Sequence, residues 1–589
     1  MRCTIKKASW WTKSFVAAVS VLAFACSGTS YDNADEDGGK RRDGGSNDAS
    51  VGDANTDGQK PPHELSRIDV TPAEHIYELD LNAAGTIDYH AVGHYLDVGG
   101  QDLTDKVTWS ISDESIGSFT GSTLNVVPSA TSEARTALVT ATLGDKRGQV
   151  QLTVVTYRKS GDKQDFFFVL PYNESEKTKP LDFKTDVRSL DVFFAMDTTG
   201  SMKDEIAHLK SSIINGIVTP MLAQIPDSQF GVGFFDDFPV RPYGAGPDQP
   251  FGLLTEITSD QEAIVNGVNR LDLHHGYDTP ESMIEALYQV ATGEGLSGPG
   301  GTSVPANNSG IGGVGFRRGT MPVVIAISDA PSHTVGEKGT PGYCESDYGE
   351  SDYAGEVARV AHSREQTKNA LTNICGRVVG VAAQDHDPTC GPVRDTTDFA
   401  VHTGARIPPS AWDVDGRPGG CAAGQCCTGM NGNGRDPDDD GLCPLVYLVD
   451  GDGNGLGEGI ISGLKMLTRF ATFDVLAKAE GGTTSKDGIA LPEGKTTADF
   501  IKSIVAVSSD KPDTPSGLPD PVPSDDKFFN VTPGTTVEFN VNAKNDFFNA
   551  TDKAVYFDAT IKVSASGCTD LDERNVIILV PPKPLSIVR

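Results

Sequence analysis

The chain has 589 residues, enough for about three or four domains of ordinary size. It carries 49 Lys and Arg residues against 81 Asp and Glu residues, a formal net charge of −32 at pH 7. This acidic excess argues against nucleic acid as a partner, because no basic surface is available to release counterions from phosphates. It suits a solvated extracellular protein that collects divalent cations.

The N-terminus has the pattern of a targeting segment, which we assign to residues 1–25. Basic residues precede an apolar run over residues 15–25, and Cys26 follows the small residue Ala25. The pattern resembles a bacterial lipoprotein signal, although Ala23 stands where that family usually has Leu. The resemblance implies cleavage before Cys26 and a lipid anchor on its thiol, which would place the chain in the cell envelope, at the outer membrane or cell surface. The alternative is an ordinary secretory signal followed by a free or disulfide-bonded cysteine.

The segment after the cysteine predicts a flexible tether and then a small β-sandwich. Residues 26–63 are rich in Gly, Asp, Asn and Ser and show no apolar period. Over residues 64–157, short alternating segments recur between turn residues at near-regular spacing. Within one of them, Val107–Ser110 followed by Ser112–Ser115 resembles bacterial immunoglobulin-like modules of surface proteins. We expect this sandwich to act as a spacer.

Residues 188–475 alternate between continuous apolar runs and amphipathic segments. Four runs predict buried strands, at Leu190–Met196, Phe230–Phe235, Met321–Ser328 and Arg377–Ala383. Helices are expected between them, because apolar residues after the first run fall on one helical face. This alternation predicts an α/β doubly wound parallel sheet, Rossmann-like, whose ligands bind beyond the carboxyl ends of the strands.

The remainder predicts a Cys-, Gly- and Asp-rich insertion at residues 406–458 and a second β-sandwich at residues 476–582. The expected fold class is therefore an α/β doubly wound domain flanked by two all-β sandwiches. Apart from Cys3 and Cys26, the cysteines are Cys344, Cys375, Cys390, Cys421, Cys426, Cys427, Cys443 and Cys568. An even number in an exported protein favours disulfides over a zinc site, but four bridges allow about 100 pairings and none is chosen.

The segment Asp197–Ser201 directly follows the first apolar run. Its carboxylate and hydroxyls are hard oxygen ligands that suit Mg²⁺ or Ca²⁺. Because hydroxyls neutralise none of the metal's charge, a cation held this way can accept a carboxylate from another molecule. Three later segments supply further oxygen ligands at the ends of predicted elements, namely Phe235–Pro239, Gly276–Glu281 and Ile327–Pro331.

With these loops in place, about half of the chain resembles the von Willebrand factor A domain, and more closely the A-like domain of integrin β subunits. The resemblance implies a metal-ion-dependent adhesion site that holds Mg²⁺ through Asp197, Thr199, Ser201, Thr279, Glu281 and Asp329. It implies an adjacent Ca²⁺ held by Asp204 and Glu205, where Glu205 replaces the family's Asp. A third ion would use Asp237, Asp278 and Glu281, but Gly276 stands where the family has Asn.

Each of these residues has a plainer explanation when taken alone. Asp197 could cap a helix, Thr279–Glu281 could begin one, and Asp329 could lie in a turn. Their joint occurrence at strand ends favours the metal site.

Other polar segments give weaker signals. Acidic runs at residues 436–441 and 450–455 resemble half of an EF-hand loop without its final Glu, so solvated acidic loops are the alternative to Ca²⁺ sites. His274 and His275 are interpreted as exposed loop residues, and Ser332–His333 as a turn.

Together these features predict a non-enzymatic, surface-anchored protein that recruits an acidic residue of a protein partner to its cation. One alternative is a structural or assembly scaffold of the cell envelope, in which the cation only stabilises the fold. Another is a metal-dependent hydrolase, which is disfavoured because the sequence places no base beside a nucleophile.

Overall fold

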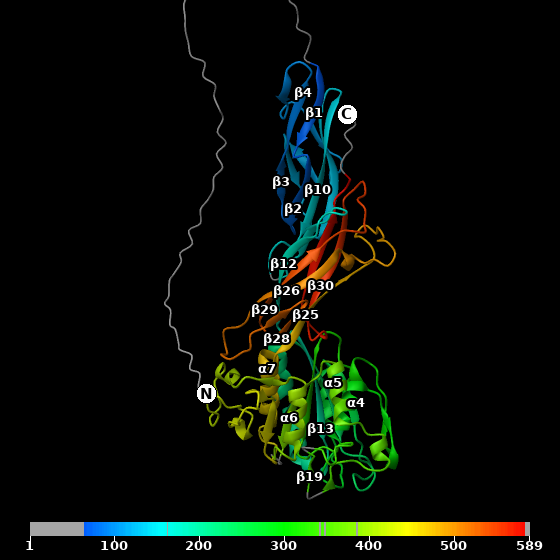
Figure 1. Ribbon diagram of the computed structural model, residues 1–589, viewed down its shortest axis with the longest axis vertical. Helices are drawn as coiled ribbons and strands as arrows, with labels where there is room; N and C mark the ends of the chain where they lie inside the picture. The colour runs from blue at the N-terminus through cyan, green and yellow to red at the C-terminus, as the bar shows by residue number, and fades with distance from the viewer. Residues whose placement is uncertain (1–63, 162, 341–342, 347–348, 384–386, 584–589) are drawn as a thin grey trace, which may run out of the picture. The chain divides into compact units, whose positions relative to one another are not determined.

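A computed structural model of the protein describes residues 64–161, 163–340, 343–346, 349–383 and 387–583 (Figure 1). These residues belong to one compact unit. The predicted signal peptide, tether and lipidation site Cys26 lie outside them. Across the described ranges, no helix combines the length and apolarity needed to cross a membrane.

The first part is built only from strands. They are β1 (Leu65–Thr71), β2 (Glu74–Asp80), β3 (Gly85–Asp88), β4 (His90–Tyr95), β5 (Gly99–Asp102), β6 (Thr108–Ile111), β7 (Gly117–Thr120), β8 (Thr123–Val126), β9 (Glu133–Leu143) and β10 (Lys146–Tyr157). They form sheets in the orders β1-β4-β5, β2-β10-β9-β6 and β3-β8-β7. One core lies between these sheets and includes Leu124, Val139 and Leu152, because alternate side chains of a strand face the same side.

A second set of strands combines residues that are far apart in the sequence. They are β11 (Phe166–Val169), β12 (Lys177–Lys184), β25 (Phe473–Gly481), β26 (Ile501–Asp510), β27 (Val522–Ser524), β28 (Lys527–Val531), β29 (Thr536–Ala543), β30 (Val555–Ala565) and β31 (Thr569–Val580), with the 3-10 helix η8 (Thr497–Phe500). They form the sheets β11-β31-β30-β25-β28-β27 and β12-β29-β26. Lys177 pairs with Ala543, so β12, drawn in cyan, lies beside the orange strand β29 (Figure 1).

Residues 189–470, here called the inserted segment, therefore interrupt this second part. Its strands are β13 (Ser189–Asp197), β14 (Asp227–Phe235), β15 (Gly252–Thr258), β16 (Leu296–Ser297), β17 (Ser303–Val304), β18 (Met321–Ser328), β19 (Glu345–Ser346), β20 (Gly349–Glu350), β21 (Arg377–Ala383), β22 (Arg406–Ile407), β23 (Cys443–Pro444) and β24 (Val446–Val449). Its α-helices are α1 (Lys203–Ser212), α2 (Thr219–Gln224), α3 (Gln261–Asn269), α4 (Met283–Thr292), α5 (Arg364–Asn373), α6 (Pro392–His402) and α7 (Leu456–Phe470).

Shorter helical pieces complete the inserted segment. The π-helix η2 spans Ile213–Val218, and the 3-10 helices are η1 (Gly200–Met202), η3 (Pro299–Gly301), η4 (Gly312–Val314), η5 (Val357–Arg359), η6 (Pro409–Asp413) and η7 (Met430–Gly432).

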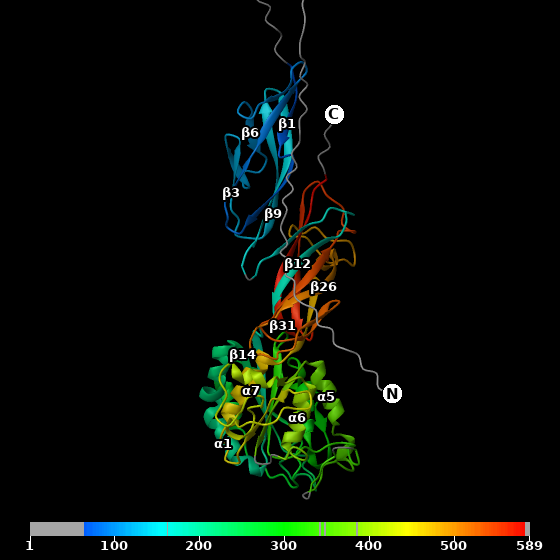
Figure 2. The ribbon, with the colours of Figure 1, turned by 60° about the vertical axis from the view of Figure 1, so that its left-hand side comes forward.

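One six-stranded sheet organises the inserted segment, in the order β15-β14-β13-β18-β21-β24. All neighbouring strands are parallel except β15, which runs antiparallel to β14. All eight residues of β18 are buried, as expected for a strand covered on both faces. Apolar residues of α1 and α7 belong to one buried cluster and those of α4 and α5 to another. Helices α1 and α5 lie on opposite sides of this part of the molecule (Figure 2).

The predicted fold class, an α/β doubly wound sheet flanked by two all-β sandwiches, is wrong for this chain. Strands account for 38% of the structure and helices for 20%, so the protein is mainly β. The helices are short, from 6 residues in α2 to 15 in α7. The prediction gave too much weight to the apolar periods of residues 188–475, where loops and the Cys-rich insertion occupy much of the chain.

The turn between β30 and β31 and the first residues of β31 join the second part to the inserted segment. Cys568 forms a disulfide with Cys375, which lies just before β21. Thr569 forms a β-bridge with Gly319, which precedes β18. Asp572 pairs with Arg188, the residue before β13, at 3.3 Å. All three contacts therefore lie at the amino ends of the parallel strands.

The other cysteines pair within the inserted segment, as the predicted disulfides require. The bridges are Cys344–Cys390, Cys421–Cys427 and Cys426–Cys443. The last two close the Cys-rich insertion.

Replacing Cys375 and Cys568 together by Ala should destabilise the protein more than replacing Cys421 and Cys427. The first bridge closes a loop of 193 residues and the second a loop of 6. Loop entropy in the unfolded chain then predicts a loss of about 5 kcal/mol against about 2 kcal/mol. Chemical denaturation of both double variants measures the difference, and equal losses would contradict the role given to the long bridge.

Candidate metal site

Three neighbouring strands, β14, β13 and β18, carry acidic residues where they end. Asp197 is the last residue of β13, Asp236 and Asp237 follow β14, and Asp329 follows β18. The parallel register pairs Asp197 with Phe235 and Met196 with Ile327. The loops that leave these strands therefore begin side by side at one edge of the sheet.

Asp197 is fully buried and held by three hydrogen bonds. Its Oδ1 accepts from the Thr199 amide at 2.9 Å and the Thr199 hydroxyl at 2.7 Å, and its Oδ2 accepts from the Ser328 hydroxyl at 2.7 Å. Burial and the nearby Asp329 carboxylate raise the pKa of Asp197 to about 8, while these hydrogen bonds oppose the shift. The hydrogen bonds therefore fix the side chain of Asp197 in a buried position where its negative charge is unfavourable.

Glu281 lies just before α4 and brings a second buried carboxylate to the site. Its backbone is fixed to the loop after β18, because its amide donates to Pro331 and its carbonyl accepts from the His333 amide. Glu281 is 4% exposed, and its buried Oε2 has no hydrogen-bond partner among the described residues. Burial, followed by the charges of Asp197 and Asp237, raises the pKa of Glu281 well above its usual value.

The absence of a side chain at Gly276 leaves space for the side chain of Glu281. The φ of Gly276 is +61°, and a Cβ at this position would lie 3.0 Å from Glu281 Oε1 and 3.4 Å from a methyl group of Thr199. Glycine is therefore the residue that lets this loop approach both groups. The Asn that the integrin β resemblance expects here would crowd Glu281.

The other predicted ligands lie around this pair with different exposure. Thr199 is buried, Asp329 and Thr279 are half-buried, and Ser201 is exposed in η1. The residues predicted for an adjacent ion lie in the first turn of α1, where Asp204 is exposed and Glu205 is buried. That turn packs closely against Gly453 in the loop before α7.

His333 is the site residue that the sequence interpretation missed. Its Nε2 lies 3.1 Å from Asp237 Oδ2 and 3.5 Å from Asp278 Oδ1, so it is not simply part of a turn. Burial lowers the pKa of His333 and the two carboxylates raise it, and the carboxylates prevail, giving a pKa of about 10. In the absence of a metal ion, the imidazole is thus positively charged at neutral pH. A single His in a loop carries no periodic signal that would have revealed this role.

His274 also differs from its interpretation as an exposed loop residue. Its Nδ1 lies 2.7 Å from Asp236 Oδ2, and its side chain is 19% exposed. The hydrogen bond that His274 donates to the Asp236 carboxylate is the main cause that raises the pKa of His274. Asp236 also accepts from the Thr198 hydroxyl, so it ties the loop after β13 to the loop before α4. His275, its neighbour, is exposed.

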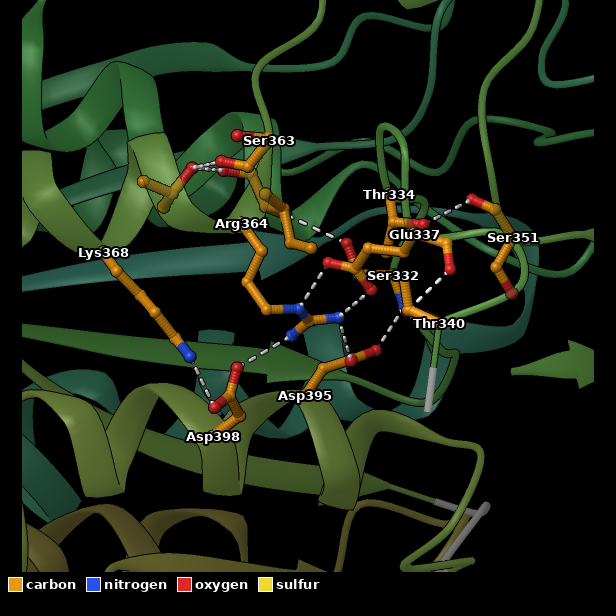
Figure 3. Close-up of polar contacts among 12 residues, drawn as sticks. Ser332, Thr334, Glu337, Thr340, Ser351, Ser363, Arg364, Lys368, Asp395 and Asp398 are labelled. Atoms are coloured by element: carbon orange, nitrogen blue, oxygen red, sulfur yellow. Dashed lines mark hydrogen bonds and ion pairs between the residues drawn. The ribbon is translucent and has the colours of Figure 1, made fainter. Parts of the chain in front are cut away.

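Helices α5 and α6 support the loop after β18 through a network of charged side chains (Figure 3). The Ser332 amide donates to Asp395 Oδ2 at 2.7 Å. Arg364 pairs with Asp395 at 2.8 Å, with Glu337 at 2.9 Å and with Asp398 at 3.2 Å. Asp395 is fully buried, so its charge depends on these partners. The network therefore ties the loop to helices α5 and α6 at Ser332 and Glu337.

The two acidic runs that resemble EF-hand loops fold back on themselves. Asp450 accepts from the amides of Asp452 and Asn454. Asp438 accepts from the amides of Asp440 and Leu442. These carboxylates therefore accept hydrogen bonds from the backbone of their own loops.

No protein-family profile and no curated protein matches this chain. Two crystal structures of the pilus adhesin SpaC from Lactobacillus rhamnosus GG, one of them in an open conformation, match at 11% identity. Each match covers 72% of this chain and 49% of the adhesin, so the chain spans about half of that protein's length. The TM-scores are 0.28 and 0.27, and a likeness this distant carries no argument about fold or function.

Replacing Asp395 by Ala should destabilise the protein by about 3 kcal/mol, because it leaves the Ser332 amide and part of Arg364 without a buried partner. Asp398→Ala is the matched control. Its carboxylate is 36% exposed, so the loss should be about 1 kcal/mol or less. Thermal and chemical denaturation measure both, and a loss as small for Asp395 as for Asp398 would contradict the supporting role of the network.

Proposed function

We propose that this protein is a non-enzymatic binding protein that takes a carboxylate of a protein partner at a bound divalent cation. The proposed ligands of the cation are Asp197, Thr199, Ser201, Glu281 and Asp329, which leave the sixth position of an octahedral ion open. The observation that carries the proposal is the buried, unpartnered Oε2 of Glu281, which shares the edge of the sheet with the buried carboxylate of Asp197. An unpaired buried charge is costly, and a cation offsets that cost.

The oxygen-rich ligand set suits Mg²⁺ or Ca²⁺, and we assign Mg²⁺ to this site from the resemblance to the integrin β A-like domain. A bound Mg²⁺ would supply a position open to one more oxygen ligand. The chain's own contribution is to hold the oxygens in place. Thr199 and Ser328 orient Asp197, while Pro331 and the His333 amide fix the backbone of Glu281. The resemblance of these loops to the integrin β A-like domain is a second support.

An adjacent Ca²⁺ at Asp204 and Glu205 belongs to the same proposal. Both residues lie in the first turn of α1, next to the exposed residue Ser201. Carboxylate oxygens are ligands that Ca²⁺ prefers.

We place the protein at the cell surface, anchored to the membrane by a lipid on Cys26, with the outer membrane as the expected location. The support is the sequence alone, namely the signal-like residues 1–25 and the tether at residues 26–63. The acidic composition supports an extracellular protein partner and not nucleic acid.

Binding of immobilised peptides tests the proposal. Peptides that carry one Asp in a neutral sequence should bind in the presence of Mg²⁺, whereas the same peptides with Asn should not. Binding should disappear with EDTA and in Asp197→Ala, because both remove the cation. The matched control is Asp145→Ala, whose side chain is 89% exposed in the turn between β9 and β10 and which should bind like the wild type.

Two outcomes would contradict the proposal. Peptide binding that survives both EDTA and Asp197→Ala would show that no cation takes part. Calorimetry with Mg²⁺ alone distinguishes a binding protein from a structural scaffold. Saturable Mg²⁺ binding that stabilises the fold, without any carboxylate-dependent peptide binding, would indicate the scaffold.

A further inference from the structure

We propose that Asp237, Asp278 and His333 form a second metal site, one that selects Zn²⁺ over Mg²⁺ and Ca²⁺. The site is separate from the proposed Mg²⁺ ligands, so it stands or falls independently of the proposed function. It also differs from the third ion that the sequence resemblance implies, because a histidine supplies a ligand and Gly276 supplies none.

The first support is that three buried atoms face one another without hydrogen bonds. Asp237 Oδ2, Asp278 Oδ1 and His333 Nε2 are buried atoms that lack a hydrogen-bond partner in the described part of the chain. The side chains of Asp237 and His333 are fully buried, and that of Asp278 is 12% exposed. The three atoms lie within 4.8 Å of one another. Nε2 of His333 forms ion-pair contacts with both carboxylate oxygens.

The distances fit a small tetrahedral ion. Ligand atoms about 2.0–2.1 Å from a tetrahedral Zn²⁺ lie about 3.3 Å apart. His333 Nε2 lies 3.1 Å from Asp237 Oδ2 and 3.5 Å from Asp278 Oδ1, values on either side of that spacing. Three protein ligands leave a fourth position for water or another oxygen.

The second support comes from the hydrogen bonds of the same side chains at their other polar atoms, which hold metal ligands in their orientation. His333 Nδ1 lies 2.9 Å from the Ser351 carbonyl, an acceptor, so Nδ1 carries the proton and leaves Nε2 free to coordinate. The other oxygen of Asp237 accepts from the Tyr353 hydroxyl and the Phe238 amide, both at 2.6 Å. The Tyr353 ring also stacks on His333, with ring centroids 4.4 Å apart.

The donor types decide the metal. Imidazole nitrogen is a good ligand for Zn²⁺, whereas Mg²⁺ and Ca²⁺ prefer sites made of oxygen alone. A Zn²⁺ here would connect the loops that follow β14 and β18 with the loop before α4. Because the His333 amide donates to the Glu281 carbonyl, the ion would also fix the backbone that presents Glu281.

Metal titration of the full chain tests the inference. Zn²⁺ should bind the wild type at this site with a dissociation constant that a large excess of Mg²⁺ or Ca²⁺ does not change. His333→Gln and Asp278→Asn should each lower the affinity for Zn²⁺ by more than about 100-fold. Loss of a metal ligand costs more affinity than loss of a residue that hydrogen-bonds to a ligand. Co²⁺ as a spectroscopic substitute should give the visible absorption of a tetrahedral site, and both variants should lose it.

The matched control is His274→Ala, which removes the histidine of the neighbouring cluster with Asp236 and Asp248. It should leave Zn²⁺ affinity and the Co²⁺ spectrum unchanged. Asp197→Ala should also leave them unchanged, which separates this site from the proposed Mg²⁺ site. Absence of Zn²⁺ binding, or binding lost in His274→Ala and kept in His333→Gln, would overturn the inference. If His333→Gln fails to fold, Asp278→Asn decides alone.

Discussion

Buried negative charge at the carboxyl ends of the parallel strands is the constraint on which the rest of this structure depends. Asp197, Asp237 and Glu281 are buried at the same edge of the sheet, close enough for the charges of the first two to act on Glu281. Burial is the main cause that raises the pKa of each of them. A fold can tolerate such a concentration of carboxylates only if donors or cations compensate it. The surrounding elements supply some of that compensation through the hydroxyl groups of Thr199 and Ser328 and through His333.

The second part of the molecule contacts the inserted segment away from the edge of the sheet that carries these carboxylates. The chain enters the inserted segment from β12 and returns through β25, and the turn between β30 and β31 contacts the amino ends of the parallel strands. An eight-residue strand such as β18 spans about 26 Å, so the acidic edge lies about that far from these contacts. The disulfide and the β-bridge therefore anchor the segment at one edge of its sheet, and the opposite edge is left for the loops that carry the candidate site.

Local sequence patterns predicted the parts of this arrangement that are local. The run Met321–Ser328 has the same limits as β18, and acidic residues at strand ends meet because parallel strands end together. The pairing of Lys177 with Ala543 lies beyond such patterns, since no short period encodes a partner so distant in the chain. The fold class was wrong for the related reason that strands outside the predicted α/β segment outweigh its short helices. His333 escaped because its role arises only when three loops meet.

The central claim is that Asp197, Glu281 and Asp329 hold a divalent cation. Anomalous diffraction from crystals grown with Mn²⁺, a hard cation that accepts the same oxygen ligands as Mg²⁺, tests it most directly. We expect an anomalous peak within bonding distance of carboxylate oxygens of Asp197, Glu281 or Asp329, and no such peak in crystals of Asp197→Ala. A fully ordered edge of the sheet with no peak there at saturating Mn²⁺ would show that these residues hold no divalent cation.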